Sequence, residues 1–253
     1  MTRTMVVGDV HGMLQELEAL MDKLAPTPED TVVFVGDLVD KGPDSAGVVR
    51  FVRELADRVP VVLVEGNHED KHRRFRRNKM VRPEVADNMA SRSPELASIT
   101  EGMSDADVAF LDAAVPFHRV PEHNLLVVHG GVPGDMTDFP ATVEEAAALT
   151  GKAKKKFQLV MRTRFVDADT GKFLQLGKET DADPFWADVW DGRFGHVVFG
   201  HQPFMDGVGR FPHATGVDTG AVFGGDLTAL VFDADGETVV SVPGRKFADH
   251  LHC

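Results

Sequence analysis

The feature that most constrains the fold is a repeated apolar run that ends in Gly and a polar cluster. "TMVVGDVHG", "TVVFVGD" and "VPVVLVEGN" begin with β-branched residues typical of strands and end in Gly followed by Asp or Asn. Between them, "MLQELEALMDKL" and "SAGVVRFVRELADRV" carry apolar residues at i, i+3, i+4 and i+7, which predicts helices. This alternation predicts a parallel sheet with right-handed crossovers and covering helices. Ligands of such sheets bind at the carboxyl ends of the strands, where the polar clusters fall.

The remainder of the chain divides into three regions. Residues 68–115 show an interrupted, polar helical pattern without a strand, which predicts a helical insertion over approximately residues 70–115. "NLLVVHGGV" then restores a strand, and residues 143–161 predict a second helical stretch. The last third, with "HVVFGHQP", "HATGVDTG", "LTALVFDADG" and "TVVSVPG", shows short strands joined by Gly and Asp turns without helices, which predicts antiparallel pairing.

Composition limits the class of protein. The chain has 253 residues, 43% of them apolar, with no apolar run near the roughly 20 residues that span a bilayer. Gly and Asp interrupt the first apolar run at once, so we expect no signal peptide. The single cysteine, Cys253, excludes an intrachain disulfide. We therefore expect one globular domain over residues 1–253, located in the cytoplasm, without membrane contact and monomeric by default.

Charge is unevenly distributed. The net charge of -13 disfavours a stable complex with nucleic acid. However, "KHRRFRRNK" and "KAKKKFQLVMRTR" each contain six Lys or Arg residues, so 12 of the 27 basic residues lie in two short segments. These segments could hold an anionic ligand locally, and the alternative is that both are solvated helix faces.

The polar clusters offer a set of candidate metal ligands. Each follows an apolar run and is bordered by Gly: Asp9, His11, Asp37, Asn67, His68, His129 and His201. Carboxylate, imidazole and amide groups suit Mn, Fe or Zn, and a thiolate site is impossible here. The set exceeds the needs of one ion, so we expect two divalent or trivalent transition-metal ions, with Mn favoured, about 3.5–4 Å apart and sharing one carboxylate.

A single motif from this set would be weak evidence for a metal site. A lone Asp-x-His is more often a turn than a metal site. Five such motifs, each at the end of a predicted strand, would rarely occur together by chance. Glycine lets the backbone turn sharply from strand to helix, which explains why "GDVHG" tolerates residues that weaken strands. The other histidines lack this context and are interpreted as ordinary surface or core residues: His72, His118, His123, His196, His213, His250 and His252.

The motifs "GDVHG", "GDLVDKG", "GNHE", "HGG" and "GH" resemble the metallophosphoesterase signature of the phosphoprotein-phosphatase type. The resemblance implies a four-layer α/β/β/α sandwich with a helical insertion. It implies that Asp9, His11 and Asp37 bind one ion. Asp37 would also bridge to the second ion, whose other ligands would be Asn67, His129 and His201.

The same resemblance implies a catalytic mechanism. The nucleophile would be a metal-bound hydroxide that attacks phosphorus directly. His68 matches the histidine that protonates the leaving oxygen, and Asp40 matches the carboxylate that orients it and keeps it charged.

The carboxyl half resembles a narrower group. "VMRTRFVDADTGKFLQLGKE", "PFWADVW" and "GVDTGAVFGGDLTALVF" are similar to segments of ApaH-type symmetrical dinucleoside tetraphosphatases and ApaH-like phosphatases. Two residues depart from the pattern. Lys41 stands where the family usually has Arg, as in ApaH-like members, and loses the bidentate fork of Arg. Asp40 stands where strict ApaH proteins have an uncharged residue, which favours the protein-phosphatase pattern.

Basic residues near these motifs are candidates for binding phosphate oxygens. We expect Lys41, Arg162 and Arg164 to do so. Because positions two apart diverge on a regular helix, joint contact by Arg162 and Arg164 requires irregular backbone. Arg73, Arg74 and Arg77 could reach a second or third phosphate, or could be structural or solvated.

Three functions follow from these observations. The first is hydrolysis of a phosphoanhydride in a dinucleoside polyphosphate or a related nucleotide or polyphosphate. The second is a protein serine/threonine phosphatase, which the presence of Asp40 and "GNHE" motivates. The third is a non-catalytic module that binds metal or nucleotide, against which the presence of both His68 and Asp40 argues.

Overall fold

The first sheet positions three of the polar clusters. The computed structural model describes residues 2–249, so Cys253, His250 and His252 lie outside the described residues. Strands β1 (Thr4–Val7), β2 (Thr31–Phe34) and β3 (Val61–Leu63) are parallel and are connected by α1 (Leu14–Leu24) and α2 (Ser45–Leu55). The long hairpin of β11 (Asp226–Asp233) and β12 (Gly236–Pro243) completes the order β12-β11-β1-β2-β3, with β11 antiparallel to β1. The predicted parallel strands and their crossover helices are confirmed.

The second sheet has the order β4-β5-β8-β10-β9. Its strands are β4 (His118–Val120), β5 (Leu125–Val128), β8 (His196–Phe199), β9 (Gly209–Phe211) and β10 (Ala214–Gly216). The antiparallel expectation holds for β11 with β12, but is wrong for β8 and β10, which pair in parallel. The sequence patterns did not predict β9, which pairs antiparallel with β10. The chain leaves β8, skips one strand position to form the edge strand β9, and returns as β10 between them. The absence of a helix between β8 and β10 therefore does not mean that these two strands form an antiparallel hairpin.

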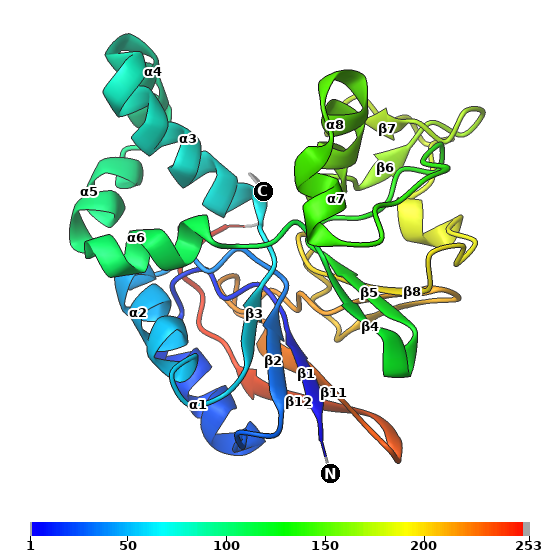
Figure 1. Cartoon of the computed structure of the whole chain (residues 1–253), viewed down its shortest axis with the longest axis horizontal. Coiled ribbons are helices and arrows are strands. Elements are labelled where there is room, and N and C mark those ends of the chain that lie inside the picture. Colours follow the sequence, from blue (N-terminus) through cyan, green and yellow to red (C-terminus); the bar gives the residue numbers. More distant parts are fainter. Residues whose placement is uncertain (1, 250–253) are drawn as a thin grey trace.

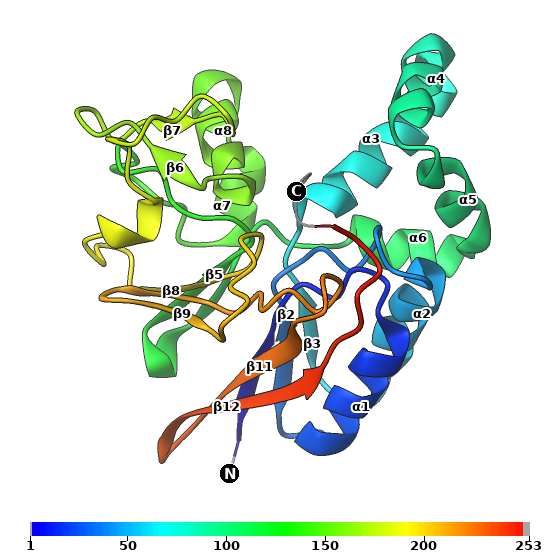
Figure 2. The same ribbon diagram turned by 180° about the vertical axis from the view of Figure 1, so that it is seen from behind.

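Alternating burial places the two sheets face to face. Met5 and Val7 pack against α1 and α2, whereas Val6 lies in a cluster with Val127 and Val198 of the second sheet. Residues on the opposite face of the second sheet pack beneath α7 (Val143–Ala148) and α8 (Gly151–Phe157). Figures 1 and 2 show the resulting succession of helices, sheet, sheet and helices. This is the predicted four-layer sandwich.

The outer layer of the second sheet is less regular than the sequence predicts. The helical stretch expected over residues 143–161 is broken between α7 and α8, because Leu149 and Thr150 have extended backbone and Gly151 has a positive φ of 56°. The layer is completed by these short elements: the 3₁₀ helices η2 (Gln158–Met161) and η3 (Trp186–Asp188), and the hairpin of β6 (Phe165–Val166) and β7 (Phe173–Leu174). A further 3₁₀ turn, η1 (Pro121–His123), joins β4 to β5.

Four consecutive helices separate β3 from the second sheet. They are α3 (Asn67–Val81), α4 (Pro83–Arg92), α5 (Glu95–Gly102) and α6 (Asp105–Asp112). Pro83 begins α4, and Ser104 with Asp107 forms a capping box at the start of α6. Figure 1 shows these helices rising beside α2 and away from the sheets. Among the described residues, no helix is both long and apolar enough to cross a membrane.

Candidate metal centre

The carboxyl ends of five strands meet at one edge of the sandwich. Asp9 and His11 follow β1, Asp37 follows β2, Asn67 and His68 begin α3 after β3, His129 follows β5, and His201 follows β8. Asp9, His11, Asp37 and His129 are buried. Residues predicted from separate motifs are thus brought together in space by the fold.

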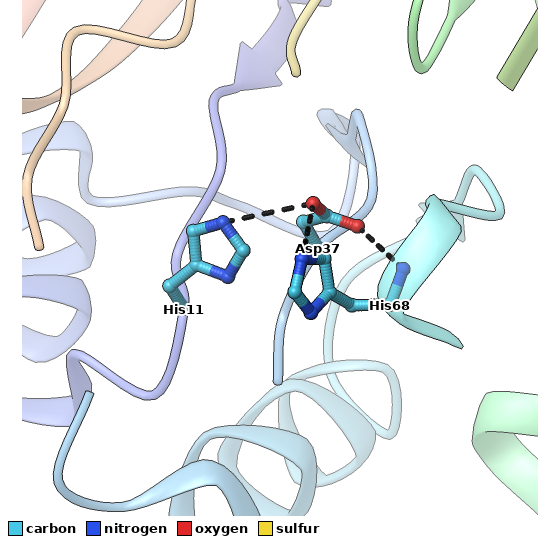
Figure 3. A group of neighbouring side chains, drawn as sticks. All are labelled: His11, Asp37 and His68. Atoms are coloured by element: carbon cyan, nitrogen blue, oxygen red, sulfur yellow. Dashed lines mark hydrogen bonds and ion pairs between the residues drawn. The ribbon is translucent and has the colours of Figure 1, made fainter. Parts of the chain in front are cut away.

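Two groups of potential metal ligands share one carboxylate. The first is His11, Asp37 and His68, and the second is Asp37, His129 and His201, with the ligand atoms of each group within 4.8 Å of one another. His11 Nε2 lies 3.6 Å, and His68 Nε2 3.7 Å, from Oδ2 of Asp37 (Figure 3). His129 Nε2 lies 3.3 Å from Oδ1 of Asp37. Each oxygen of Asp37 therefore faces a different set of imidazoles, as a carboxylate between two ions would require.

Backbone carbonyls orient two of the imidazoles. Nδ1 of His11 donates to the Val39 carbonyl and Nδ1 of His129 to the Val35 carbonyl, each at 2.9 Å. Because a carbonyl can only accept, these contacts place a proton on Nδ1 and aim Nε2 at Asp37. Such an outer hydrogen bond fixes the tautomer of metal-binding histidines.

The charge of the site favours a cation. Burial, and next Asp218, raise the pKa of Asp9, and burial raises that of Asp218. Burial acts on Asp37 in the same direction, but His129 and His68 hold its pKa well below the usual value. Burial lowers the pKa of His129, yet Asp37 and Asp9 outweigh this and raise it to about 9. A proton on His129 thus compensates the carboxylates, and a metal ion would take its place.

Several site residues adopt strained backbone. Of the seven non-glycine residues with positive φ among the described residues, five lie at this site: His11, Asp37, Asp40, Lys41 and His201. Left-handed backbone is uncommon for residues with a Cβ, and it clusters at functional sites. Gly36 also has a positive φ of 107°, and a Cβ there would in addition lie 2.6 Å from the backbone nitrogen of Gly66.

Glu69 organises the turn that carries Asp37, a role the sequence reasoning missed. Its carboxylate accepts hydrogen bonds from the backbone N–H groups of Asp37 and Leu38, both at 2.8 Å, and of Gly66 at 2.9 Å. Burial, and next Asp37, raise its pKa to about 7. The signal was present, because Glu69 is the last letter of "GNHE".

Asp40 lies behind His68 and accepts from three donors. His68 Nδ1 lies at 2.5 Å from Oδ2, His72 Nε2 at 2.7 Å from Oδ1, and Lys71 Nζ at 2.5 Å from Oδ2. Burial would raise the pKa of Asp40, but the hydrogen bonds from His68 and His72 hold it well below its usual value. His72 is fully buried, so its interpretation as an ordinary residue is corrected: it is a hydrogen-bond partner of Asp40. Helical spacing, i and i+4 from His68, was the available signal.

The three predicted phosphate-binding residues adjoin the same site. Lys41 Nζ lies 2.8 Å from His11 Nε2. Arg164 is buried and donates to the carbonyl of His201 at 2.7 Å, whereas Arg162 donates to Asp70 at 2.7 Å. The helix ends at η2, and Arg162 has φ −140° and ψ −1°, so the backbone is irregular there as joint contact required. Both arginines line a cavity of about 310 Å³ together with Asn67 and His201.

The other described histidines lie outside the two ligand groups. His196, for example, bonds to the hydroxyl of Thr215 at 2.9 Å, and His123 packs on the ring of Phe232. For His118, His123, His196 and His213, the interpretation as ordinary surface or core residues stays a prediction.

Comparison with known proteins gives matches over most of the chain. The family model of calcineurin-like phosphoesterases matches residues 2–205. The chain is 31% identical over 255 residues to the asymmetrical bis(5'-nucleosyl)-tetraphosphatase PrpE of Halalkalibacterium halodurans, covering 95% of this chain and 94% of the relative. The same enzyme of Oceanobacillus iheyensis is 28% identical over 253 residues, covering 95% and 92%.

Solved structures agree in architecture. A structure described as that of "a putative diadenosine tetraphosphatase" has a TM-score of 0.69 and 30% identity, covering 96% of this chain and 94% of the other. A protein serine/threonine phosphatase of Saccharomyces cerevisiae has a TM-score of 0.62 but 16% identity, covering 98% and 82%, which shows a shared fold alone.

Proposed function

The chain belongs to the calcineurin-like phosphoesterase family, and from this premise we propose that it hydrolyses a phosphoanhydride bond of dinucleoside tetraphosphates. One observation carries the proposal: two ligand groups share Asp37 beside a cavity that Arg162 and Arg164 line. The tetraphosphatase relatives, similar over nearly their whole length, support this class of substrate.

We assign the ligands of two ions. Asp9, His11 and Asp37 would hold one ion, and Asp37, Asn67, His129 and His201 the other. The mixed donor set suits Mn²⁺, with Fe or Zn as alternatives. When bound, such ions acidify water and withdraw charge from phosphoryl oxygens.

The protein groups around the ions have separate roles in this proposal. His68 donates a proton from Nε2 to the leaving oxygen, since its Nδ1 is held by Asp40 and its Nε2 faces the site. Lys41, Arg162 and Arg164 bind phosphate oxygens, and the arginines can do so with two parallel N–H groups. Asp40 remains ionised and orients His68.

The names of two relatives support a proposal for the position of the cut. Both PrpE enzymes are named asymmetrical, whereas the ApaH-type enzymes that the carboxyl half resembles are symmetrical. We propose asymmetrical cleavage, which yields a nucleoside triphosphate and a nucleoside monophosphate. Symmetrical cleavage would instead yield two nucleoside diphosphates.

A protein serine/threonine phosphatase is the second candidate function. The observation that favours it is the contact between Asp40 and His68, because Asp40 matches the protein-phosphatase pattern. The contact also argues against a non-catalytic binding module, which has no need of an acid.

The domain organisation completes the proposal. We assign the chain to a single domain in which α3–α6 form a helical insertion. The contacts of α2 with α5 and α6 support this, since the insertion packs on the covering layer of the first sheet.

A side-by-side turnover assay tests the proposed function. The protein, loaded with Mn²⁺, is given diadenosine tetraphosphate, polyphosphate and a phosphothreonine peptide under identical conditions. We expect the dinucleotide to have the highest kcat/KM and chromatography to show ATP and AMP. A higher kcat/KM for the peptide would instead establish the protein-phosphatase function, and two ADP molecules would establish symmetrical cleavage.

A further inference from the structure

A cleft between α3 and the α7–α8 pair extends away from the metal centre. Its volume is about 540 Å³, within the roughly 300–1,000 Å³ of small-molecule sites. In Figures 1 and 2 the two helical elements stand on opposite sides of the edge where the strands end. The reaction at the metal centre does not itself require this cleft.

The two walls of the cleft differ in chemistry. Arg73, Arg74 and Arg77 line it from α3, together with Glu65 and Asp70, the carboxylates that pair with Arg73 and Arg74. The opposite wall is largely apolar, with Ala147 and Phe157 among its residues, and carries one cation, Lys154. A nucleotide matches these two walls, since its phosphates are anionic and its base is flat and weakly polar.

The cleft adjoins the smaller cavity beside the metal centre at Arg74. This residue lines both the cleft and the smaller cavity that contains Asn67, Arg162 and His201. A chain of phosphates leaving the metal centre would therefore pass Arg162 and Arg74 before it reached the cleft.

Asp70 holds these two arginines together. Its Oδ2 accepts from Arg74 Nε at 2.9 Å and from Arg162 Nη2 at 2.7 Å, which joins α3 to the segment after η2. Farther along, Arg77 and Lys154 have no carboxylate within ion-pair distance among residues 2–249, and both are exposed. In a chain of net charge -13, the far part of the cleft thus presents two cations without a paired carboxylate, whereas Arg162 and Arg74, nearer the metal centre, share Asp70.

We propose that this cleft binds the distal nucleotide of the substrate, with Arg74, Arg77 and Lys154 on the phosphates beyond the scissile bond and the apolar wall against the nucleoside. The inference rests on the proposed function, because it takes a dinucleoside polyphosphate as the substrate. It makes the cleft the element that distinguishes such a substrate from a small phosphomonoester.

The test compares two charge-removing double variants. Arg77→Gln with Lys154→Gln removes the two unneutralised cations of the cleft. Lys79→Gln with Lys152→Gln removes two charges from the same two helices, at positions that do not line the cleft. All four residues are exposed, so both proteins should fold.

The readout is a ratio: kcat/KM for diadenosine tetraphosphate divided by kcat/KM for p-nitrophenyl phosphate. We expect the cleft variant to lower this ratio about tenfold or more, since charge-assisted contacts to phosphate are lost, and to raise the inhibition constant of ATP. The control variant should keep the wild-type ratio. An unchanged ratio in the cleft variant, or an equal fall in both variants, would overturn the subsite.

The two proposals fail in different ways. If the wild-type protein turns over p-nitrophenyl phosphate but not diadenosine tetraphosphate, the proposed function is wrong and the subsite falls with it. If the wild-type protein cleaves the dinucleotide and the cleft variant does so at the same ratio, only the subsite is wrong.

Discussion

Two neighbouring regions of the site are held in place by different means. The metal floor comprises the proposed metal ligands Asp9, His11, Asp37, Asn67, His129 and His201. The arginine rim comprises Arg73, Arg74, Arg77 and Arg162. Asp9, His11, Asp37 and His129 are at most 3% exposed, whereas the side chains of Arg73, Arg74 and Arg162 are 41–43% exposed.

The two regions also differ in the contacts that hold their side chains in place. Backbone carbonyls, backbone N–H groups and left-handed turns fix the metal floor, and two sheets contribute to it. Ion pairs of half-exposed arginines with Asp70 and Glu65 hold most of the arginine rim, and pairs whose cation remains in contact with solvent contribute little stability. The difference teaches that the fold determines the chemistry of the floor, whereas the rim can change with the substrate at small cost to stability.

The largest expected effect comes from removing the carboxylate that both ligand groups share. Asp37→Asn should lose metal from both positions and lower kcat/KM by more than the roughly 10–100-fold that loss of an outer-shell partner costs. Elemental analysis and turnover measure this, with the exposed Asp138→Asn as the control. Retention of two ions by Asp37→Asn would show that the floor does not depend on a bridging carboxylate.

The next effect concerns the proton donor. His68→Ala should lower kcat by about 10²–10⁴-fold with metal content unchanged. The loss should be larger for phenyl phosphate than for p-nitrophenyl phosphate, because the poorer leaving group has more need of a proton. The exposed His213→Ala is the control. Since His68 also lies within 4.8 Å of ligand atoms of His11 and Asp37, loss of metal would make it part of the metal floor.

A smaller effect of the same kind is expected at His72. His72→Asn removes one of three donors to Asp40, so kcat should fall about tenfold, with the same dependence on the leaving group as in His68→Ala. A purely structural role for His72 predicts an equal loss for both esters. The thermal midpoint of the variant, measured beside that of His213→Asn, separates misfolding from mispositioning.

The rim should respond more weakly than the floor. Asp70→Asn frees Arg74 and Arg162 from their shared carboxylate, and we expect KM for diadenosine tetraphosphate to rise about two- to fivefold, in keeping with the small free energy of exposed pairs. kcat/KM for p-nitrophenyl phosphate should change less than that for the dinucleotide, and metal content should not change. A loss of metal from this variant would break the distinction between rim and floor.

An ion pair far from both regions should affect stability alone. Asp30 is buried and accepts from Arg3 and Thr27, and although burial raises its pKa, these hydrogen bonds hold it below the usual value. The carboxylate therefore stabilises the fold above the unfolded pKa of about 3.9, and this contribution is lost as pH falls toward the lowered native pKa. Asp30→Asn should cost about 1–3 kcal/mol at pH 7 and less at pH 3, measured by urea unfolding, with no change in turnover.

The sequence predicted the floor better than the rest of the molecule. Each proposed ligand stands directly after an apolar strand, and parallel strands bring their carboxyl ends to one edge, so the local pattern was enough to predict that these residues lie together. The pairing of β8 with β10 could not be predicted in this way, because it depends on which strand position the chain skips. The break between α7 and α8 differs: the apolar periodicity continues across Leu149, but Thr150 and Gly151 are residue types that mark a helix boundary.

The missed residues have a different explanation. Glu69 accepts from the backbone of Asp37, and His72 bonds to the side chain of Asp40. Both contacts form only when α3 packs against the turn after β2. Residue type alone did not separate His72 from the other histidines. Asp218 likewise reaches the site from the loop after β10, at a distance in sequence that no local pattern bridges.

The left-handed turns at His11, Asp37, Asp40, Lys41 and His201 also bear on how such a site can evolve. In each of these residues the left-handed backbone costs on the order of 1–3 kcal/mol of folding free energy. Replacement by Gly would remove this strain, but it would also remove the functional side chain. Mutations that stabilise this edge are therefore expected to be the ones that inactivate it. Gains in thermal resistance that keep activity are therefore expected from substitutions elsewhere in the molecule.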